Sequence, residues 1–285
     1  MTWSDKLLSR VGVSEDIGIV VLSRRLLVFS GTSPNQVNEV SLGYVAPPPA
    51  PPPAALPPHV RDGLMTKRHF DPAPHIASCF RRNEIIDFEA AESAIQQALH
   101  SVGPRRRRFV KPRVVVADAS RESMTRKRAL LDATERAGAR KIYLTSMAMC
   151  CALGAGLSIL DDEVHAVLLV EHDWSVFSVM TYADEIASRF IPVGTDDIPD
   201  PRYGSDWRDL LGYEISSALD ELRPPQTEKL QRSGIHCCGQ AATDPWAETA
   251  QNLTGFTAHP THPDEHPAVE GLRHYLNHLD EWKPA

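Results

Sequence analysis

Two acidic turns beside short β-branched runs carry the side chains best suited to chemistry. The first acidic turn consists of Ser14, Glu15, Asp16 and Ile17. The second acidic turn consists of Glu171, His172, Asp173, Trp174 and Ser175. Carboxylates at such turns can hold paired Mg²⁺ for phosphodiester cleavage, and the candidates are Glu15, Asp16, Asp118, Glu171 and Asp173. The alternative, which we favour, is that both turns are solvated loops.

The cysteine and histidine residues lack the spacing of metal sites. Four of the five cysteines form two adjacent pairs, Cys150-Cys151 and Cys237-Cys238, whereas zinc ligands are usually separated by two or more residues. We therefore expect small buried thiols in a reducing compartment. A proline-rich run, typical of an exposed loop, carries three histidines: His259, His262 and His266. No metal is expected.

Composition and charge exclude several classes of protein. The chain has 285 residues, of which 42% are hydrophobic, enough for one large core or two modest ones. Lys and Arg number 30 against 37 Asp and Glu, giving a net charge of -7, which does not suit nucleic-acid binding. No apolar run has the length of a membrane span, and the N-terminal residues lack the apolar core of a signal peptide. We therefore expect a cytoplasmic protein.

A pattern of short strands occurs twice along the chain. In the first half the predicted strands are residues 11–13, 17–22 and 26–29. In the second half they are residues 164–170, 175–180 and 186–191. In each half an acidic turn separates the first two strands. This weak internal repeat predicts two similar α/β halves.

Helix signals and one proline-rich stretch complete the organisation. Asp87 is a predicted N-cap for a helix that places Phe88, Ala91, Ile95 and Leu99 on one face. Further helices are predicted over residues 121–138, 147–154, 214–222 and 271–282. Residues 46–58 are rich in proline, which neither pairs in a sheet nor continues a helix, so they form a linker or a docking strip.

Three segments at the centre of the chain carry a resemblance: residues 111–116, 128–133 and 137–144. Without a gap, they are similar to the central stretch of MreB, the bacterial actin-like, rod shape-determining family. The resemblance implies the actin-like ATPase fold, with two ribonuclease H-like halves around a cleft. Each half of the family carries a small subdomain, and in this chain both are expected to be reduced. The halves are expected at residues 1–157, with the Pro-rich insertion 46–58, and 158–285. The C-terminal helix 271–282 is expected to pack back on the first half.

The resemblance also implies ATP and Mg²⁺ in the cleft, but the residues that would hold them are replaced. The family has glycine-rich turns where we place the two acidic turns, because backbone N–H groups must approach the phosphates there. Two unit charges ~4 Å apart repel by about 4 kcal/mol at an effective dielectric of ~20. The turn carboxylates and the bulky Trp174 would therefore oppose a triphosphate.

Two further nucleotide elements of the family are degenerate in this chain. The family's Glu-Glu-Pro, which helps to organise the attacking water, is replaced by Ser146, Met147 and Ala148. Its glycine-rich adenosine loop is replaced by Cys238, Gly239, Gln240 and Ala241. Four separate changes together favour the loss of nucleotide chemistry over a variant site.

We therefore expect a pseudo-ATPase without cofactor that acts in cell-shape or filament biology through protein contacts. Its expected partners are a true MreB filament or a cell-shape complex, and an acidic partner could meet the basic run Arg105, Arg106, Arg107 and Arg108. At the N-terminus we favour a frayed end; the alternative is a short amphipathic helix that makes weak membrane contact through Trp3, Leu7 and Leu8. The alternative is a polymerising ATPase that binds ATP and Mg²⁺ at an unorthodox site.

Overall fold

The structure is a computed structural model that describes residues 16–46, 75–102, 111–119, 123–197, 206–239, 244–261 and 266–279. Several predicted features lie outside these residues. They are Ser14, Glu15, the N-terminal Trp3, Leu7 and Leu8, nearly all of the Pro-rich stretch, the run of four arginines, Gln240, Ala241 and His262. No helix among the described residues has the length and apolar character needed to cross a membrane.

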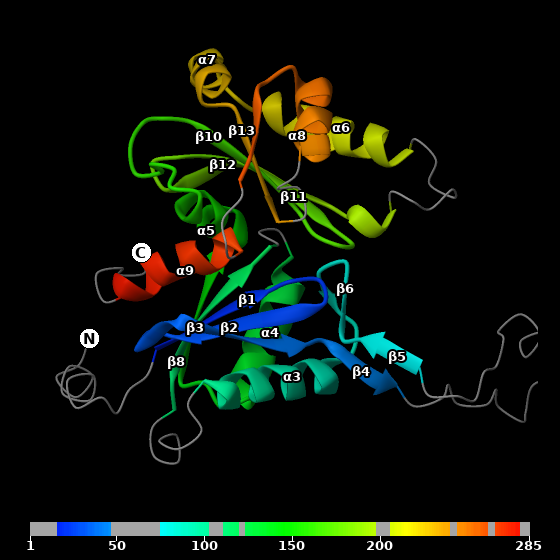
Figure 1. Cartoon of the computed structure of the whole chain (residues 1–285), viewed down its shortest axis with the longest axis vertical. Coiled ribbons are helices and arrows are strands. Elements are labelled where there is room, and N and C mark those ends of the chain that lie inside the picture. Colours follow the sequence, from blue (N-terminus) through cyan, green and yellow to red (C-terminus); the bar gives the residue numbers. More distant parts are fainter. Residues whose placement is uncertain are drawn as a thin grey trace, which may run out of the picture.

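The first half is built on a five-stranded sheet of order β3-β2-β1-β8-β9. Its strands are β1 (Asp16–Val21), β2 (Arg25–Ser30), β3 (Ser33–Ser41), β8 (Arg113–Asp118) and β9 (Lys141–Ser146). Strand β1 pairs antiparallel with β2 and parallel with β8. Helices α3 (Phe88–Ser101) and α4 (Met124–Arg136) bury their apolar faces against one side of this sheet (Figure 1).

Short pairs of strands extend the first half. Strand β4 (Gly43–Ala46) pairs with β5 (His75–Ser78), and β6 (Phe80–Arg81) pairs with β7 (Glu84–Ile85). Helix α3 follows at once because Asp87 caps it, its Oδ1 accepting a hydrogen bond from the backbone N–H of Ala90 at 2.9 Å. The sequence predicted this cap.

The second half repeats the same sheet, with strand order β12-β11-β10-β13-β14. The strands are β10 (His165–Val170), β11 (Ser175–Thr181), β12 (Asp184–Ile191), β13 (Ile235–Gly239) and β14 (Ala258–Pro260). The helical elements of this half are η1 (Thr195–Asp197), α6 (Asp206–Leu219), α7 (Pro224–Ser233) and α8 (Asp244–Thr254). Since β10 pairs antiparallel with β11 and parallel with β13, β1 and β10 are equivalent strands.

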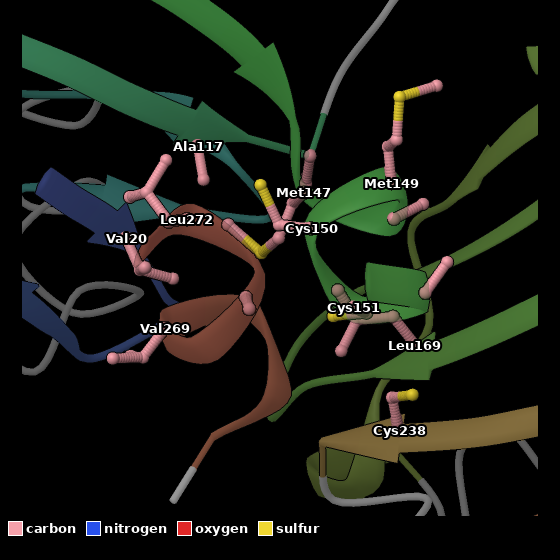
Figure 2. Packing of buried hydrophobic residues seen from close by; sticks show 14 of the residues in the cluster. Val20, Ala117, Met147, Met149, Cys150, Cys151, Leu169, Cys238, Val269 and Leu272 are labelled. Carbon is pink, nitrogen blue, oxygen red and sulfur yellow. The ribbon is translucent and has the colours of Figure 1, made fainter. Parts of the chain in front are cut away.

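Helices α5 (Met147–Gly154) and α9 (Pro267–Asn277) lie between the two sheets (Figure 1). The buried cluster around them contains residues of both halves. Figure 2 shows Val20 of β1 and Leu272 of α9 close to Cys150 of α5, and Leu169 and Cys238 of the second half around Cys151. All five cysteines are free and buried, and burial raises the pKa of the Cys79 thiol to about 11. The cysteines are therefore unreactive packing residues.

Several element predictions need correction. Strand β3 was not predicted, because its sequence SPNQVNEVS is polar and mostly exposed. Pro224 and Pro225 begin α7 rather than closing the preceding helix, since proline is tolerated in the first helical turn. The helices predicted over residues 214–222 and 271–282 are Asp206–Leu219 and Pro267–Asn277. His259 lies in β14, not in a loop.

His236 of β13 makes the stability of the second half dependent on pH. Its ring lies 6.4 Å from that of His165 and 5.5 Å from that of His259, measured between centroids. Burial, with the two histidines, lowers the pKa of His236 from 6.5 to about 4. The unfolded chain binds a proton at this residue at a higher pH than the folded chain does, so stability should fall as the pH decreases from about 6.5 towards about 4.

Urea unfolding at a series of pH values measures this effect. The His236→Asn variant should lose less stability than the wild type over the same pH window, because its amide does not titrate. Parallel curves for the two proteins would assign the pH dependence to other groups.

Candidate functional site: the cleft between the hairpin turns

The two halves present equivalent hairpin turns. Residues 22–24 join β1 to β2, with Val21 opposite Leu26, and residues 171–174 join β10 to β11, with Val170 opposite Ser175. Both turns follow the carboxyl end of the central strand that pairs with a parallel neighbour. In open α/β sheets ligands bind at this edge, so these turns are the counterparts of the expected phosphate turns.

The predicted position of the first phosphate turn, from Ser14 to Ile17, is therefore wrong. Asp16 and Ile17 begin β1, at the opposite end of the strand from the hairpin turn. Arg113 donates from Nε and Nη2 to the two carboxylate oxygens of Asp16, each at 2.6 Å. Residues 11–13, which lie outside the described residues, have the apolar pattern of a strand. Counting them as the first strand displaces the predicted turn by one strand.

The first hairpin turn consists of Leu22, Ser23 and Arg24 and has no glycine. Leu22 and Ser23 are buried, and the Leu22 N–H donates to the carbonyl of Arg25 at 3.0 Å. Arg24 is exposed and pairs with Asp196 of the second half. The turn therefore exposes the positive charge of Arg24. Its buried residues, Leu22 and Ser23, restrict the conformation of the backbone.

The second hairpin turn departs from the prediction in the direction of its side chains. Trp174 is buried in the core beside Phe190, with the ring centroids 6.2 Å apart. Trp174 does not obstruct the cleft as predicted, because its position next to β11 turns the indole into the core. Ser175 is also buried and donates to the carbonyl of Val193 at 2.6 Å. Neither side chain is available to a ligand.

Glu171 lies at the inner side of the second turn and is also buried. Its Oε1 lies 3.2 Å from Nε2 of His266, the N-cap of α9. His266 Nδ1 accepts the N–H of Ala268 at 3.3 Å, so Nε2 carries the hydrogen and donates it to Glu171. Gly239, the one glycine of the degenerate adenosine loop, has φ +69, and an added Cβ would lie 3.0 Å from this carboxylate.

Direct contacts between the halves cross the mouth of the cleft. The backbone N–H of Arg82, in the β6–β7 turn, donates to Oδ2 of Asp173 at 2.6 Å. The Arg82 guanidinium lies 3.4 Å from Oδ1 of Asp197. His172 Nδ1 lies 3.5 Å from Oδ1 of Asp196, the residue that also pairs with Arg24. We call Arg24, Arg82, Asp173, Asp196 and Asp197 the cleft clamp.

The backbone around the clamp is held in unusual conformations. Arg82 and Asn83 have φ of 46 and 62, in the left-handed region that non-glycine residues rarely adopt and that often marks functional sites. Gly194 lies so close to the second turn that an added Cβ would be 2.4 Å from the backbone N of Asp173. The close contact at Gly194 holds Asp173 and η1 in positions from which their carboxylates face the first half.

The Asp173 carboxylate should therefore contribute measurably to stability. The Asp173→Ala change leaves the N–H of Arg82 without its acceptor, and we expect a loss of about 1–3 kcal/mol of unfolding free energy. Asp173→Asn keeps an acceptor oxygen and should lose less. Urea unfolding of the three proteins measures the order; equal stability of wild type and Asp173→Ala would show that the clamp contact is absent in solution.

Among the described residues, the candidate carboxylates for paired Mg²⁺ do not meet. Asp16 pairs with Arg113, Asp118 with Arg126, and Glu171 with His266. Within the part of the chain that the structure describes, no group of three His, Cys, Asp or Glu side chains is arranged to hold a metal ion. The positions of the family's Glu-Glu-Pro begin α5, where Ser146 donates to Glu185 and Met147 and Ala148 are buried.

Comparisons with known proteins show which family and which solved structures this chain resembles. The sequence model of the family described as MreB/Mbl protein matches residues 75–201. The structure of MreB5 of Spiroplasma citri bound to ADP superposes with a TM-score of 0.74 at 15% identity, covering 94% of this chain and 98% of that one. The MamK double helical filament gives 0.64 at 11% identity, covering 95% and 100%.

A non-polymerisable quadruple mutant of pCBH ParM gives a TM-score of 0.60 at 11% identity, covering 94% of this chain and 100% of that one. At such identities these likenesses establish the fold, and the sequence match establishes the relationship of the central segment. Together they show that the chain has the actin-like fold and that its central segment, residues 75–201, is similar to the MreB/Mbl family.

Proposed function

We propose that this MreB-like protein has exchanged nucleotide binding for direct contact between its halves and acts by binding other proteins. The setting we propose is filament or cell-shape biology in the bacterial cytoplasm. The observation that carries the proposal is the cleft clamp, in which Asp173 of the second phosphate-type turn accepts the Arg82 N–H from the first half. We propose that these protein groups join the halves in place of a nucleotide.

The residues of this chain do not fit ATP and Mg²⁺. Neither hairpin turn contains a glycine, so neither offers the open row of N–H groups that cradles phosphates. Three carboxylates lie at the mouth. Asp196 and Asp197 pair with the guanidinium groups of Arg24 and Arg82, and Asp173 accepts the backbone N–H of Arg82. A triphosphate would have to displace these ion pairs and then face the carboxylates in the same small space.

Filament biology is supported by the relatives. One matching structure is a MamK double helical filament, and another is MreB5 bound to ADP. For this chain, we propose both a role in filament biology and the loss of nucleotide binding. The two ion pairs of the clamp, Arg24–Asp196 and Arg82–Asp197, are partly exposed and each worth roughly 0.2–1 kcal/mol, so they position the halves more than they stabilise the fold.

High-speed sedimentation followed by negative-stain microscopy tests the proposed function. The purified chain should stay in the supernatant with or without ATP and Mg²⁺, and it should pellet when polymers of a true MreB are added. Filaments formed by the chain alone, and only with ATP, would overturn the proposal.

The alternative, a polymerising ATPase with an unorthodox site, has one observation in its favour. A cavity of about 260 Å³ lies beside both hairpin turns, and its lining includes Arg24, Arg25 and His172. Cationic side chains of this kind attract phosphate. However, Glu39 and Glu171 line the same cavity, and Arg25 is paired with Glu39 at 2.9 Å, so we place this function second.

A further inference from the structure

The turn between β11 and β12 holds an exposed aromatic side chain in a conformation that favours glycine. Tyr182 and Ala183 have φ of 50 and 57, the left-handed values that a two-residue hairpin turn requires and that Asn and Gly adopt readily. A bulky residue is disfavoured there. The side chain of Tyr182 is 67% exposed, so core packing does not compensate for this conformation.

A neighbouring loop fixes the turn and adds a second apolar side chain. The N–H of Tyr182 donates to the carbonyl of Asp161 at 3.0 Å, and the N–H of Ala183 donates to the carbonyl of Ile159 at 2.6 Å. Leu160 lies between these two acceptors in the sequence and is 72% exposed. Tyr182 and Leu160 therefore form a rigid exposed apolar pair, the kind of feature that marks a protein contact.

The rim of this apolar pair is acidic. Four exposed carboxylates surround it in the loop and the turn: Asp161, Asp162, Glu163 and Asp184. The cation nearby, Lys229, is already paired with Asp162. Complementary potentials across an interface select and steer partners, so this rim favours a basic partner over an acidic one.

A cavity of about 250 Å³ begins beside the same turn. Asp184 and Glu185 line it together with Asp118, Lys127, Leu144, Thr145, Ser146, Met149 and Ala119. Asp118 is 5% exposed, and its Oδ2 has no hydrogen-bond partner among the described residues. A buried acceptor without a partner is unfavourable, so the cavity suits a group that brings N–H donors. It is smaller than the ~300–1,000 Å³ of typical ligand pockets, so one side chain fits it better than a cofactor.

We propose that this surface, composed of Tyr182, Leu160, the acidic rim and the cavity at Asp118, docks a basic segment of a partner protein. An Arg or Lys side chain of the partner enters the cavity and donates to Asp118 and its neighbours. An adjacent large apolar residue of the partner covers Tyr182 and Leu160. The inference deepens the proposed function, on which it rests, by naming the chemistry of the partner.

Tyr182→Gly is the informative variant, because glycine suits the turn. This variant should unfold at the same or a higher temperature than the wild type while losing the contact. Asp184→Asn tests the rim while leaving Tyr182 and Ala183 in place. Tyr213→Ala is the matched control, since Tyr213 is a 70% exposed aromatic residue on α6, outside the proposed surface.

The probe is a library of short random peptides displayed on phage and selected on the full wild-type chain. We expect the selected peptides to combine Arg or Lys with a large apolar residue. They should lose affinity by about tenfold or more on Tyr182→Gly, as for an aromatic hot spot, and bind Tyr213→Ala unchanged. On Asp184→Asn they should bind more weakly, with a smaller dependence on salt.

Three results would overturn the inference. They are a selection that yields no basic-apolar peptides, equal binding to wild type and Tyr182→Gly, and self-assembly of the wild type that Tyr182→Gly abolishes, which would assign the surface to a second copy. ATP binding by the chain would contradict the proposed function but leave the peptide result standing, so the two failures are distinguishable.

Discussion

Replacing Arg126 by Met is expected to reduce the free energy of unfolding by about 3–5 kcal/mol, because it leaves a buried carboxylate without its counter-charge. The guanidinium of Arg126 donates from Nε and Nη2 to Oδ1 of Asp118 at 2.9 and 2.6 Å. The two side chains are 1% and 3% exposed. The pair joins α4 to the carboxyl end of β8, so its loss should also loosen the floor of the cavity.

Two further variants separate this effect from the loss of a long side chain. Arg128→Met on the same helix removes an arginine that is 81% exposed and should change stability by less than about 0.5 kcal/mol. The double variant Asp118→Leu with Arg126→Met should recover most of the loss, since an apolar pair needs no counter-charge. Urea unfolding measures all four proteins; a full loss in the double variant would show that packing, not charge, explains the effect.

Gly271→Ala is expected to destabilise the chain by about 3 kcal/mol or more, the upper range for overpacking a core. A Cβ at Gly271 of α9 would lie 1.8 Å from the carbonyl oxygen of Cys150 in α5. On the other side of the crossing, a Cβ at Gly154 of α5 would lie 1.9 Å from the carbonyl oxygen of Pro267. Because backbone atoms make both contacts, the helices must separate to admit a methyl group.

The control for this variant is Gly212→Ala in α6. A Cβ there would meet only the flexible side chain of Leu253, at 3.2 Å, and alanine is favoured over glycine in helices by about 1 kcal/mol. We expect this variant to be as stable as the wild type or slightly more stable in thermal unfolding. If Gly271→Ala behaved like Gly212→Ala, the close crossing of α5 and α9 would be wrong.

The sequence predicted those parts of the fold whose signals are local. The N-cap at Asp87, the end of α4 before Gly138, which has φ +112, and the apolar strand β8 all follow from neighbouring residues. The doubled strand pattern was predicted as well, and the strands predicted at residues 17–22 and 26–29 are β1 and β2; the one predicted at residues 11–13 lies outside the described residues. Strand β3 could not be predicted, because its pairing with β2 stabilises a sequence that lacks apolar alternation.

The site was predicted less well than the fold, for two reasons. The position of the first phosphate-type turn depends on aligning β1 with β10, and strand pairing establishes that alignment. In the sequence, aligning residues 17–22 with residues 164–170 would have indicated the correct turn. The cleft clamp depends on contacts between residues far apart in the chain, such as Arg82 and Asp173, which are 91 positions apart. Nothing in the local sequence around Arg82 indicates that its N–H meets a carboxylate of the other half.

Calorimetric titration of the purified chain with ATP and Mg²⁺ tests the central claim most directly. The claim is that the protein's own side chains, on Arg24, Arg82, Asp173, Asp196 and Asp197, join the halves where a nucleotide would. We predict no saturable heat up to millimolar ATP and no shift of the unfolding temperature at that concentration. A saturable isotherm with a dissociation constant in the micromolar range would contradict this account and restore the ATPase.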